Sequence, residues 1–207
     1  MNKELIKRIL SSIVLIPLAL FFIIKGSILF IFFISICFLI IAYEWHMMSK
    51  NKSYYLYGLI FLIFSFLTVY FLQISDYRAT LLVVTICVST DIGGYVFGKL
   101  FKGPKLTKFS PNKTYAGMFG GYFFSLISIT MFPFMDFDFM QLSKFLFIIG
   151  ISSVSQIGDI TISYFKRLSK IKDTGKIIPG HGGLLDRVDG MIFAFPFATG
   201  IFYIGFF

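Results

Sequence analysis

Long runs of apolar residues, each bounded by a short polar or basic segment, follow one another along the chain. A helix needs about 20 residues to cross about 30 Å of hydrocarbon. Runs of that length predict spanning helices at 54–74, 79–97, 115–135, 145–165 and 188–207. The run 9–42 would be about 50 Å long as one helix, so Lys25-Gly26 predicts a break into two helices. We expect an all-α, polytopic membrane bundle of about seven transmembrane helices.

The composition supports a membrane protein. Hydrophobic residues make up 57% and charged residues 14% of the 207 residues, whereas soluble domains average about a quarter charged. No long polar stretch separates the apolar runs, so no additional soluble domain is expected. The basic start of the chain is followed by no small-residue cleavage site, which indicates a retained first helix. Cys37 and Cys87 lie inside apolar runs and are interpreted as packing residues.

Basic residues gather in alternate loops. With the N-terminus placed inside, Lys25, Arg78 and Lys144 are the exceptions among the 19 Lys and Arg residues, and the others fall on the inner side. Cytoplasmic loops carry the excess of Lys and Arg, so the N-terminus is predicted to be cytoplasmic. The loops 98–114 and 166–187 are the most basic. Both belong to a predicted C-terminal catalytic region, 91–207, which follows the N-terminal helices of region 1–90.

Acidic residues lie inside or at the start of the predicted spans beside these two loops. Asp91 and Asp159 each precede a basic loop by about two helical turns, and Asp186 and Asp189 are spaced to share one helical face. Buried charges are costly in a membrane and usually face a polar interior. Ion pairing between helices is the structural alternative, and for Asp91 the two interpretations are evenly balanced. For the other three acids, carboxylate ligation of Mg²⁺ is favoured.

The second basic loop ends in a glycine-rich turn. Gly182 and Gly183 would let backbone N–H groups approach an anion closely. The neighbouring His181 is a weak signal by itself, because a lone loop histidine more often supports its loop through hydrogen bonds. Neither loop carries a P-loop pattern, so Walker-type nucleotide binding is not predicted. Gly94-x-x-x-Gly98 and Gly117-x-x-x-Gly121 have the spacing of close helix packing.

Three blocks of this region together resemble the signature of the phosphatidate cytidylyltransferases. They are Ser163-x-Phe165-Lys166-Arg167, Lys172-Asp173-x-Gly175 and Pro179-x-His181-Gly182-Gly183-Leu184-x-Asp186-Arg187-Val188-Asp189. The stretch from Asp91 to Gly121 is similar to the family's second region, although Ala116 replaces a polar residue there. The resemblance covers about half of the chain, and the N-terminal half looks short for the family.

The resemblance implies a membrane enzyme that makes CDP-diacylglycerol and pyrophosphate from CTP and phosphatidic acid. It implies a site on the cytoplasmic face of the bacterial inner membrane, with CTP, phosphatidic acid and the lipid bilayer as partners. A homodimer is left open, and no nucleic acid is expected. Asp159, Asp186 and Asp189 would hold Mg²⁺, with a second metal ion also left open.

The other site residues follow from the same resemblance. The expected catalytic residues are Asp159, Lys166, Arg167, Lys172, Asp186, Arg187 and Asp189. The expected substrate-binding residues are Asp91, Lys105, Ser110, Lys113, Thr114, Ser163, His181, Gly182 and Gly183. The basic members of both sets would neutralise substrate phosphates, which repel one another as they meet.

Two alternatives remain at this stage. A CTP-using lipid kinase would share the nucleotide but move only a phosphate to the lipid. A cation-coupled membrane transporter would also carry intramembrane acids. Transporters, however, tend to place their sites near the midplane between repeated halves, and this chain has acids toward one face and no internal repeat.

Overall fold

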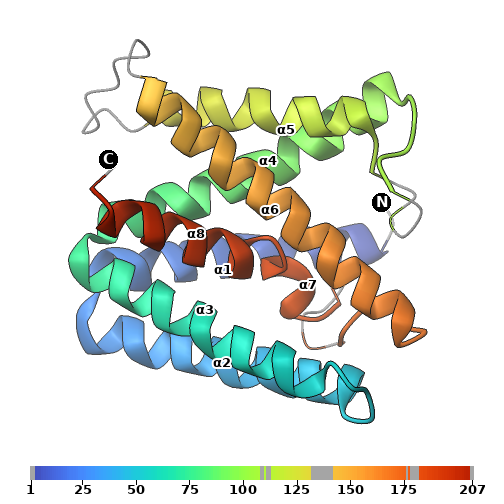
Figure 1. The fold of residues 1–207 in the computed structure, drawn as a ribbon, viewed down its shortest axis with the longest axis horizontal. Coiled ribbons are helices and arrows are strands. Elements are labelled where there is room, and N and C mark those ends of the chain that lie inside the picture. The colour runs from blue at the N-terminus through green and yellow to red at the C-terminus, as the bar shows by residue number, and fades with distance from the viewer. Residues whose placement is uncertain are drawn as a thin grey trace. The chain divides into compact units, whose positions relative to one another are not determined.

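The computed structural model describes residues 3–107, 110, 113–131, 142–175, 177 and 182–205, and these residues form helices and short connections. The long helices are α1 (Lys3–Lys25), α2 (Ser27–Ser49), α3 (Tyr55–Ser75), α4 (Tyr77–Phe101), α5 (Tyr115–Ser128), α6 (Leu142–Leu168) and α8 (Met191–Tyr203) (Figure 1). A 3-10 turn, Ile129–Met131, extends α5, and α7 is a single turn, Leu185–Val188. The described residues contain no strand, so the expected all-α class is confirmed.

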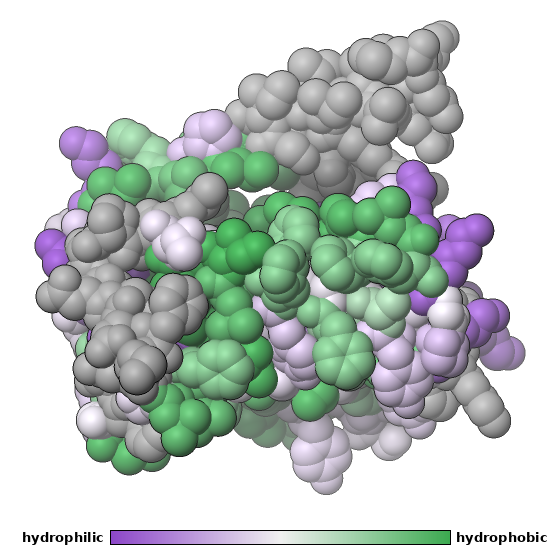
Figure 2. Space-filling model, turned by 90° about the horizontal axis from the view of Figure 1, so that it is seen from above, coloured by the Kyte–Doolittle hydropathy of each residue, from purple (hydrophilic) through white to green (hydrophobic). Residues whose placement is uncertain are grey.

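The helices carry the apolar surface that a bilayer requires. Within the described ranges, α2, α3, α4 and α6 are each long and apolar enough to cross a membrane. Large hydrophobic side chains such as Ile28, Leu39 and Phe64 are exposed on them. Figure 2 shows hydrophobic residues over much of the coloured surface on the visible face. The chain is therefore a multi-pass membrane protein, and together with α1, α5 and α8 these helices agree with the predicted number of about seven.

The predicted break in the first apolar run is confirmed. Helix α1 ends at Lys25 and α2 begins at Ser27. Gly26 joins them with a φ of 59°, a left-handed conformation that glycine adopts at little cost because it has no Cβ. Helix α2 does not end at Ala42, as the apolar run predicted, but continues to Ser49. This extension places Glu44 inside the helix.

Contacts divide the chain into two compact units. The first unit consists of Met1–Leu81 and Phe165–Asp189, and the second of Leu82–Tyr164 and Gly190–Phe207. In the first unit α2 packs against α1, α3 and α7, and Figure 1 shows α2 and α3 side by side. The predicted regions 1–90 and 91–207 were grouped by candidate chemistry rather than by contacts, and that division stays a prediction.

Glycines set the distance between α4 and α5 in the second unit. A Cβ added at Gly120 would lie 2.6 Å from the carbonyl oxygen of Gly93, and one at Gly117 would lie 2.8 Å from that of Gly94. Real side chains do not tolerate such approaches, so small residues are required along this contact. The close packing predicted from the glycine spacing is confirmed. Helix α4 also contacts α6, where the Thr90 hydroxyl donates to Ser152 Oγ at 2.8 Å.

Candidate active site

The carboxylate of Asp186 lies at the centre of a hydrogen-bonded cluster in the first unit. Its Oδ1 accepts a hydrogen bond from Lys166 Nζ at 2.9 Å. Its Oδ2 accepts from the backbone N–H groups of Thr174 at 2.8 Å and Gly183 at 3.1 Å. Only 7% of the Asp186 side chain and 10% of the Lys166 side chain are exposed. Two segments of the second basic loop, 173–175 and 182–185, thus fold around one nearly buried ion pair.

The glycine turn beside Asp186 is required by its backbone. Gly182 has a φ of +87°, and a Cβ there would lie 3.1 Å from Asp186 Oδ2. A left-handed residue pressed against a carboxylate favours glycine. The sequence predicted that Gly182 and Gly183 let an anion approach backbone N–H groups. In the structure, the anion that meets the Gly183 N–H is the protein's own Asp186.

The spacing of Asp186 and Asp189 also has the predicted helical basis. Asp186 lies in α7, and Asp189 follows that turn with helical dihedral angles, φ −56° and ψ −37°. Asp189 is buried, with 8% of the residue exposed, whereas Arg187 between them is exposed. Residues three apart in helical conformation share a face, so Asp186 and Asp189 lie on one side of this helical segment.

A second carboxylate–lysine pair lies in the second unit. Asp159 of α6 forms an ion pair with Lys113, and 27% and 24% of the two side chains are exposed. Ser163, one turn further along α6, donates to Asp159 Oδ1 at 3.5 Å. The first basic loop thereby supplies a lysine to an acid inside the predicted span.

The backbone of the first basic loop holds Lys113 in place. The Leu106 N–H donates to the carbonyl of Lys113 at 2.8 Å, and Lys105 and Thr114 form an antiparallel bridge. Thr114 Oγ1 accepts from the Gly117 N–H at 3.1 Å and caps α5. The Ser110 N–H donates to Thr107 Oγ1 at 3.2 Å. Four residues predicted as substrate contacts therefore shape this loop.

The remaining candidates are distributed as follows. Arg167 is exposed and donates from Nη1 to the carbonyl of Ile171 at 3.1 Å. Lys172 and Asp91 are exposed, on the second loop and on α4. His181 lies outside the described residues.

The three acids predicted to hold Mg²⁺ are divided between the units. Asp159 belongs to the second unit, and Asp186 and Asp189 belong to the first. In the part of the chain that the structure describes, neither unit contains a cluster of three Asp, Glu, His or Cys side chains that could hold a metal ion. Metal ligation by the three acids stays a prediction.

Comparison with known proteins identifies the family. Residues 75–205 match the model of the cytidylyltransferase family. The phosphatidate cytidylyltransferase of Rickettsia typhi is 35% identical over 205 residues, which is 94% of this chain and 90% of the relative. The chain belongs to the cytidylyltransferase family. The enzymes of the same name from Rickettsia felis and Staphylococcus saprophyticus are similar too. The Rickettsia felis enzyme is 36% identical, and the match covers 91% of this chain and 88% of that enzyme. The Staphylococcus saprophyticus enzyme is 34% identical, and the match covers 79% of this chain and 65% of that enzyme.

The first unit also contains a buried acid that the sequence did not predict as a site residue. Glu44 of α2 is 1% exposed. Its Oε1 accepts from the Leu184 N–H at 2.9 Å, and its Oε2 accepts from the Leu185 N–H at 2.8 Å. Thr174 Oγ1 donates to Oε2 at 3.2 Å. Glu44 is the only acid in the apolar segment 27–49, and this isolation is the sequence signal that could have identified it. The predicted helix end at Ala42 left it outside the span.

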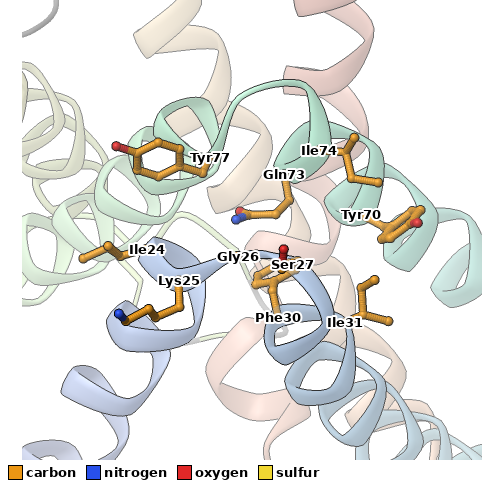
Figure 3. A pocket seen from close by; sticks show the side chains of 10 residues that line it. All are labelled: Ile24, Lys25, Gly26, Ser27, Phe30, Ile31, Tyr70, Gln73, Ile74 and Tyr77. Carbon is orange, nitrogen blue, oxygen red and sulfur yellow. The ribbon is translucent and has the colours of Figure 1, made fainter.

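A separate cavity of the first unit lies at the turns that join α1 to α2 and α3 to α4. It has a volume of about 340 Å³, and Lys25, Tyr70, Gln73 and Tyr77 are among its lining residues (Figure 3). Gln73 Nε2 donates to the carbonyl of Ile23 at 2.8 Å and ties α3 to the α1–α2 turn. None of the site residues predicted from the sequence lines this cavity.

Proposed function

We propose that this protein is a phosphatidate cytidylyltransferase, which makes CDP-diacylglycerol and pyrophosphate from CTP and phosphatidic acid. The observation that carries the proposal is the Asp186 cluster. Within the motif that resembles this family, two backbone N–H groups hold a carboxylate that pairs with a lysine. The names of the similar Rickettsia and Staphylococcus enzymes support the same reaction.

The proposed reaction joins two anions. A phosphate oxygen of phosphatidic acid attacks the α-phosphorus of CTP, the new P–O bond forms, and the bond to the β-phosphate breaks to release pyrophosphate. A phosphomonoester has a second pKa of about 6, so the attacking group is already anionic and needs no general base. The main barrier is repulsion between phosphates, which positive side chains reduce. Lys166, Arg167, Lys172 and Arg187 are proposed for this role.

Metal dependence is part of the proposal. Asp159, Asp186 and Asp189 offer oxygen donors only, which is the donor chemistry that Mg²⁺ prefers. These three acids would hold one or two Mg²⁺ ions, and the metal would supply positive charge beside the CTP phosphates. The protein's own contribution would be to orient the carboxylates, as the N–H groups of Thr174 and Gly183 orient Asp186.

The test is the fate of labelled CTP. Purified protein in lipid vesicles receives CTP labelled in the α-phosphate or in the γ-phosphate, together with phosphatidic acid. A cytidylyltransferase transfers the α label to the lipid fraction and leaves the γ label in pyrophosphate. A CTP-using lipid kinase would transfer the γ label instead, and a transporter would transfer neither. Asp186→Asn should abolish transfer while the protein stays folded, and chelation of divalent cations should abolish transfer by the unaltered protein.

The proposed site faces the cytoplasm of the bacterial inner membrane. The asymmetry of basic residues supports this orientation, because cytoplasmic loops carry more Lys and Arg. In a background with Cys37 and Cys87 replaced by Ala, Lys52→Cys should react with a membrane-impermeant maleimide only in inverted vesicles. Arg78→Cys should react only in right-side-out vesicles. The reverse pattern would contradict the orientation.

A further inference from the structure

Two neighbouring residues of α2 contact the segments that carry the Asp186–Lys166 pair. Glu44 accepts three hydrogen bonds from the segments that surround Asp186. The ring of Trp45 lies 5.5 Å from that of Phe165, edge to face, and Phe165 directly precedes Lys166. Trp45 is itself fixed by a hydrogen bond from Nε1 to the carbonyl of Tyr55 at 3.0 Å. One turn of α2 thus supports the loop on one side and the end of α6 on the other.

The loop leaves room for the Glu44 carboxylate. A Cβ added at Gly175 would lie 2.6 Å from Glu44 Oε1, and one at Gly183 would lie 2.6 Å from Oε2. Larger residues at either position would displace the carboxylate. The two glycines of the motif therefore face Glu44, and the pattern of glycines in the loop agrees with a carboxylate at this position.

Glu44 and Asp186 divide the donors of the same two loop segments between them. The Thr174 N–H donates to Asp186, whereas the Thr174 hydroxyl donates to Glu44. The Gly183 N–H donates to Asp186, and the next two N–H groups donate to Glu44. A change in the position of Glu44 would therefore move the donors that orient Asp186.

Burial of this carboxylate is costly, and packing alone does not explain it. No described Lys or Arg forms an ion pair with Glu44, which accepts hydrogen bonds from two N–H groups and one hydroxyl. An apolar side chain of similar volume would fill the space without the cost of removing a charge from water. Its hydrogen bonds, rather than its volume, distinguish Glu44 from such a side chain.

We propose that Glu44 is a positioning residue, which fixes the segments 173–175 and 182–185 so that Asp186 and Lys166 are aligned for the phosphates. The inference rests on the proposed function. It assigns a catalytic requirement to α2, which lies outside the matched family region 75–205. Misplacement of reacting groups by about 1 Å can cost about 100-fold in rate.

The test compares Glu44→Gln and Glu44→Asp with the unaltered protein. Glutamine keeps the length but replaces one acceptor oxygen with an NH₂ group that faces a donor, and aspartate keeps the charge but shortens the reach. We expect kcat to fall about 10- to 100-fold in Glu44→Gln, a range typical of residues that orient ligands. The KM for CTP should change less than about 3-fold, because the cations that contact phosphate remain. Glu44→Asp should retain more activity than Glu44→Gln.

Amide hydrogen exchange reports how firmly the segment 182–185 is held, and it does not depend on catalytic activity. In Glu44→Gln the amides of Leu184 and Leu185 should exchange faster, while amides within α3 keep their protection. Thr174→Val removes only the hydroxyl contact and serves as the variant if Glu44→Gln does not fold; it should also speed exchange in 182–185. Gln73→Leu is the matched control, because it removes a buried hydrogen bond of the same unit far from these segments along the chain. Its kcat per folded molecule should be unchanged.

The outcomes separate the two proposals. If the unaltered protein transfers no α label to lipid, the proposed function fails, and the exchange data still report whether Glu44 holds the loop. If Glu44→Gln keeps more than half of the kcat, or if activity falls only in proportion to the folded fraction as in Gln73→Leu, the positioning role is overturned. Unchanged exchange at Leu184 and Leu185 would overturn it as well.

Discussion

The Asp186–Lys166 pair and the Asp159–Lys113 pair differ in how firmly the chain holds them. Asp186 and Lys166 are nearly buried, and two backbone N–H groups fix the carboxylate. Asp159 and Lys113 are about a quarter exposed, and Asp159 also accepts a 3.5 Å hydrogen bond from Ser163. The same two residue types therefore form one rigid pair and one adaptable pair.

The difference assigns distinct tasks to the pairs. A buried carboxylate with several donors costs little to keep in one geometry once the protein is folded, so it suits a fixed reference point for substrates. A partly exposed ion pair contributes less stability than a buried one, so Lys113 can leave Asp159 for a substrate phosphate at smaller cost than Lys166 can leave Asp186. In the proposed reaction, Asp186 is pre-arranged and Lys113 is exchangeable.

Removal of the acids should give the largest effects and tests this comparison most directly. Asp186→Asn is expected to lower turnover by at least about 100-fold. It should also destabilise the protein by about 3 kcal/mol, because Lys166 loses its buried partner. Asp159→Asn should lower turnover by a similar factor with at most about 1 kcal/mol of destabilisation. Transfer of α-labelled CTP to lipid and thermal unfolding in detergent measure the two effects. Equal destabilisation by both changes would contradict the comparison.

Replacement of the lysines should separate the pairs by stability alone. Lys166→Met leaves Asp186 as a buried, unpaired charge, which costs about 3–5 kcal/mol. Lys113→Met breaks a partly exposed pair, which costs about 0–1 kcal/mol. Thermal unfolding at low and high salt distinguishes the two pairs, because salt screens partly exposed pairs more than buried ones. The stability loss in Lys113→Met should therefore shrink more at high salt than the loss in Lys166→Met. If Lys113→Met destabilised the protein as much as Lys166→Met, the small stability contribution assigned to the Lys113–Asp159 pair would be wrong.

The sequence predicted features that depend on neighbouring residues and missed those that depend on distant ones. The break at Gly26 and the close packing of α4 and α5 follow from the absence of a Cβ at particular glycines, so they could be read locally. The end of α2 was placed at Ala42, where the apolar run stops, although polar residues continue the helix to Ser49. The role of Glu44 depends on Leu184, which is 140 residues away. No periodicity within α2 reports that contact.

Gly183 donates its N–H to Asp186 and lies against Glu44, and its replacement should have a third, smaller effect. In Gly183→Ala the new Cβ would lie 2.6 Å from Glu44 Oε2 and closer still to Thr174 Oγ1. Overpacking of this kind costs about 1–3 kcal/mol, and the displaced loop should lower turnover about 10-fold. Gly200→Ala is the matched control, because a Cβ there meets nothing within 4 Å. Thermal unfolding and label transfer should change in the first variant and stay constant in the second.

Loss of the α5 cap should have the smallest effect, and it tests how the adaptable pair is held. Thr114→Ala removes the acceptor for the Gly117 N–H, which typically costs about 1 kcal/mol. Turnover should fall by about 3-fold or less, because Lys113 is also held through the backbone pairing of its loop. Thr114→Ser keeps the cap oxygen and should restore stability and activity together. If Thr114→Ala raises the KM for CTP several-fold at unchanged stability, the hydroxyl contacts substrate, as the sequence predicted. The capping role of Thr114 would then matter less than its contact with CTP. The first basic loop would bind the substrate through the Thr114 hydroxyl as well as through the charge of Lys113.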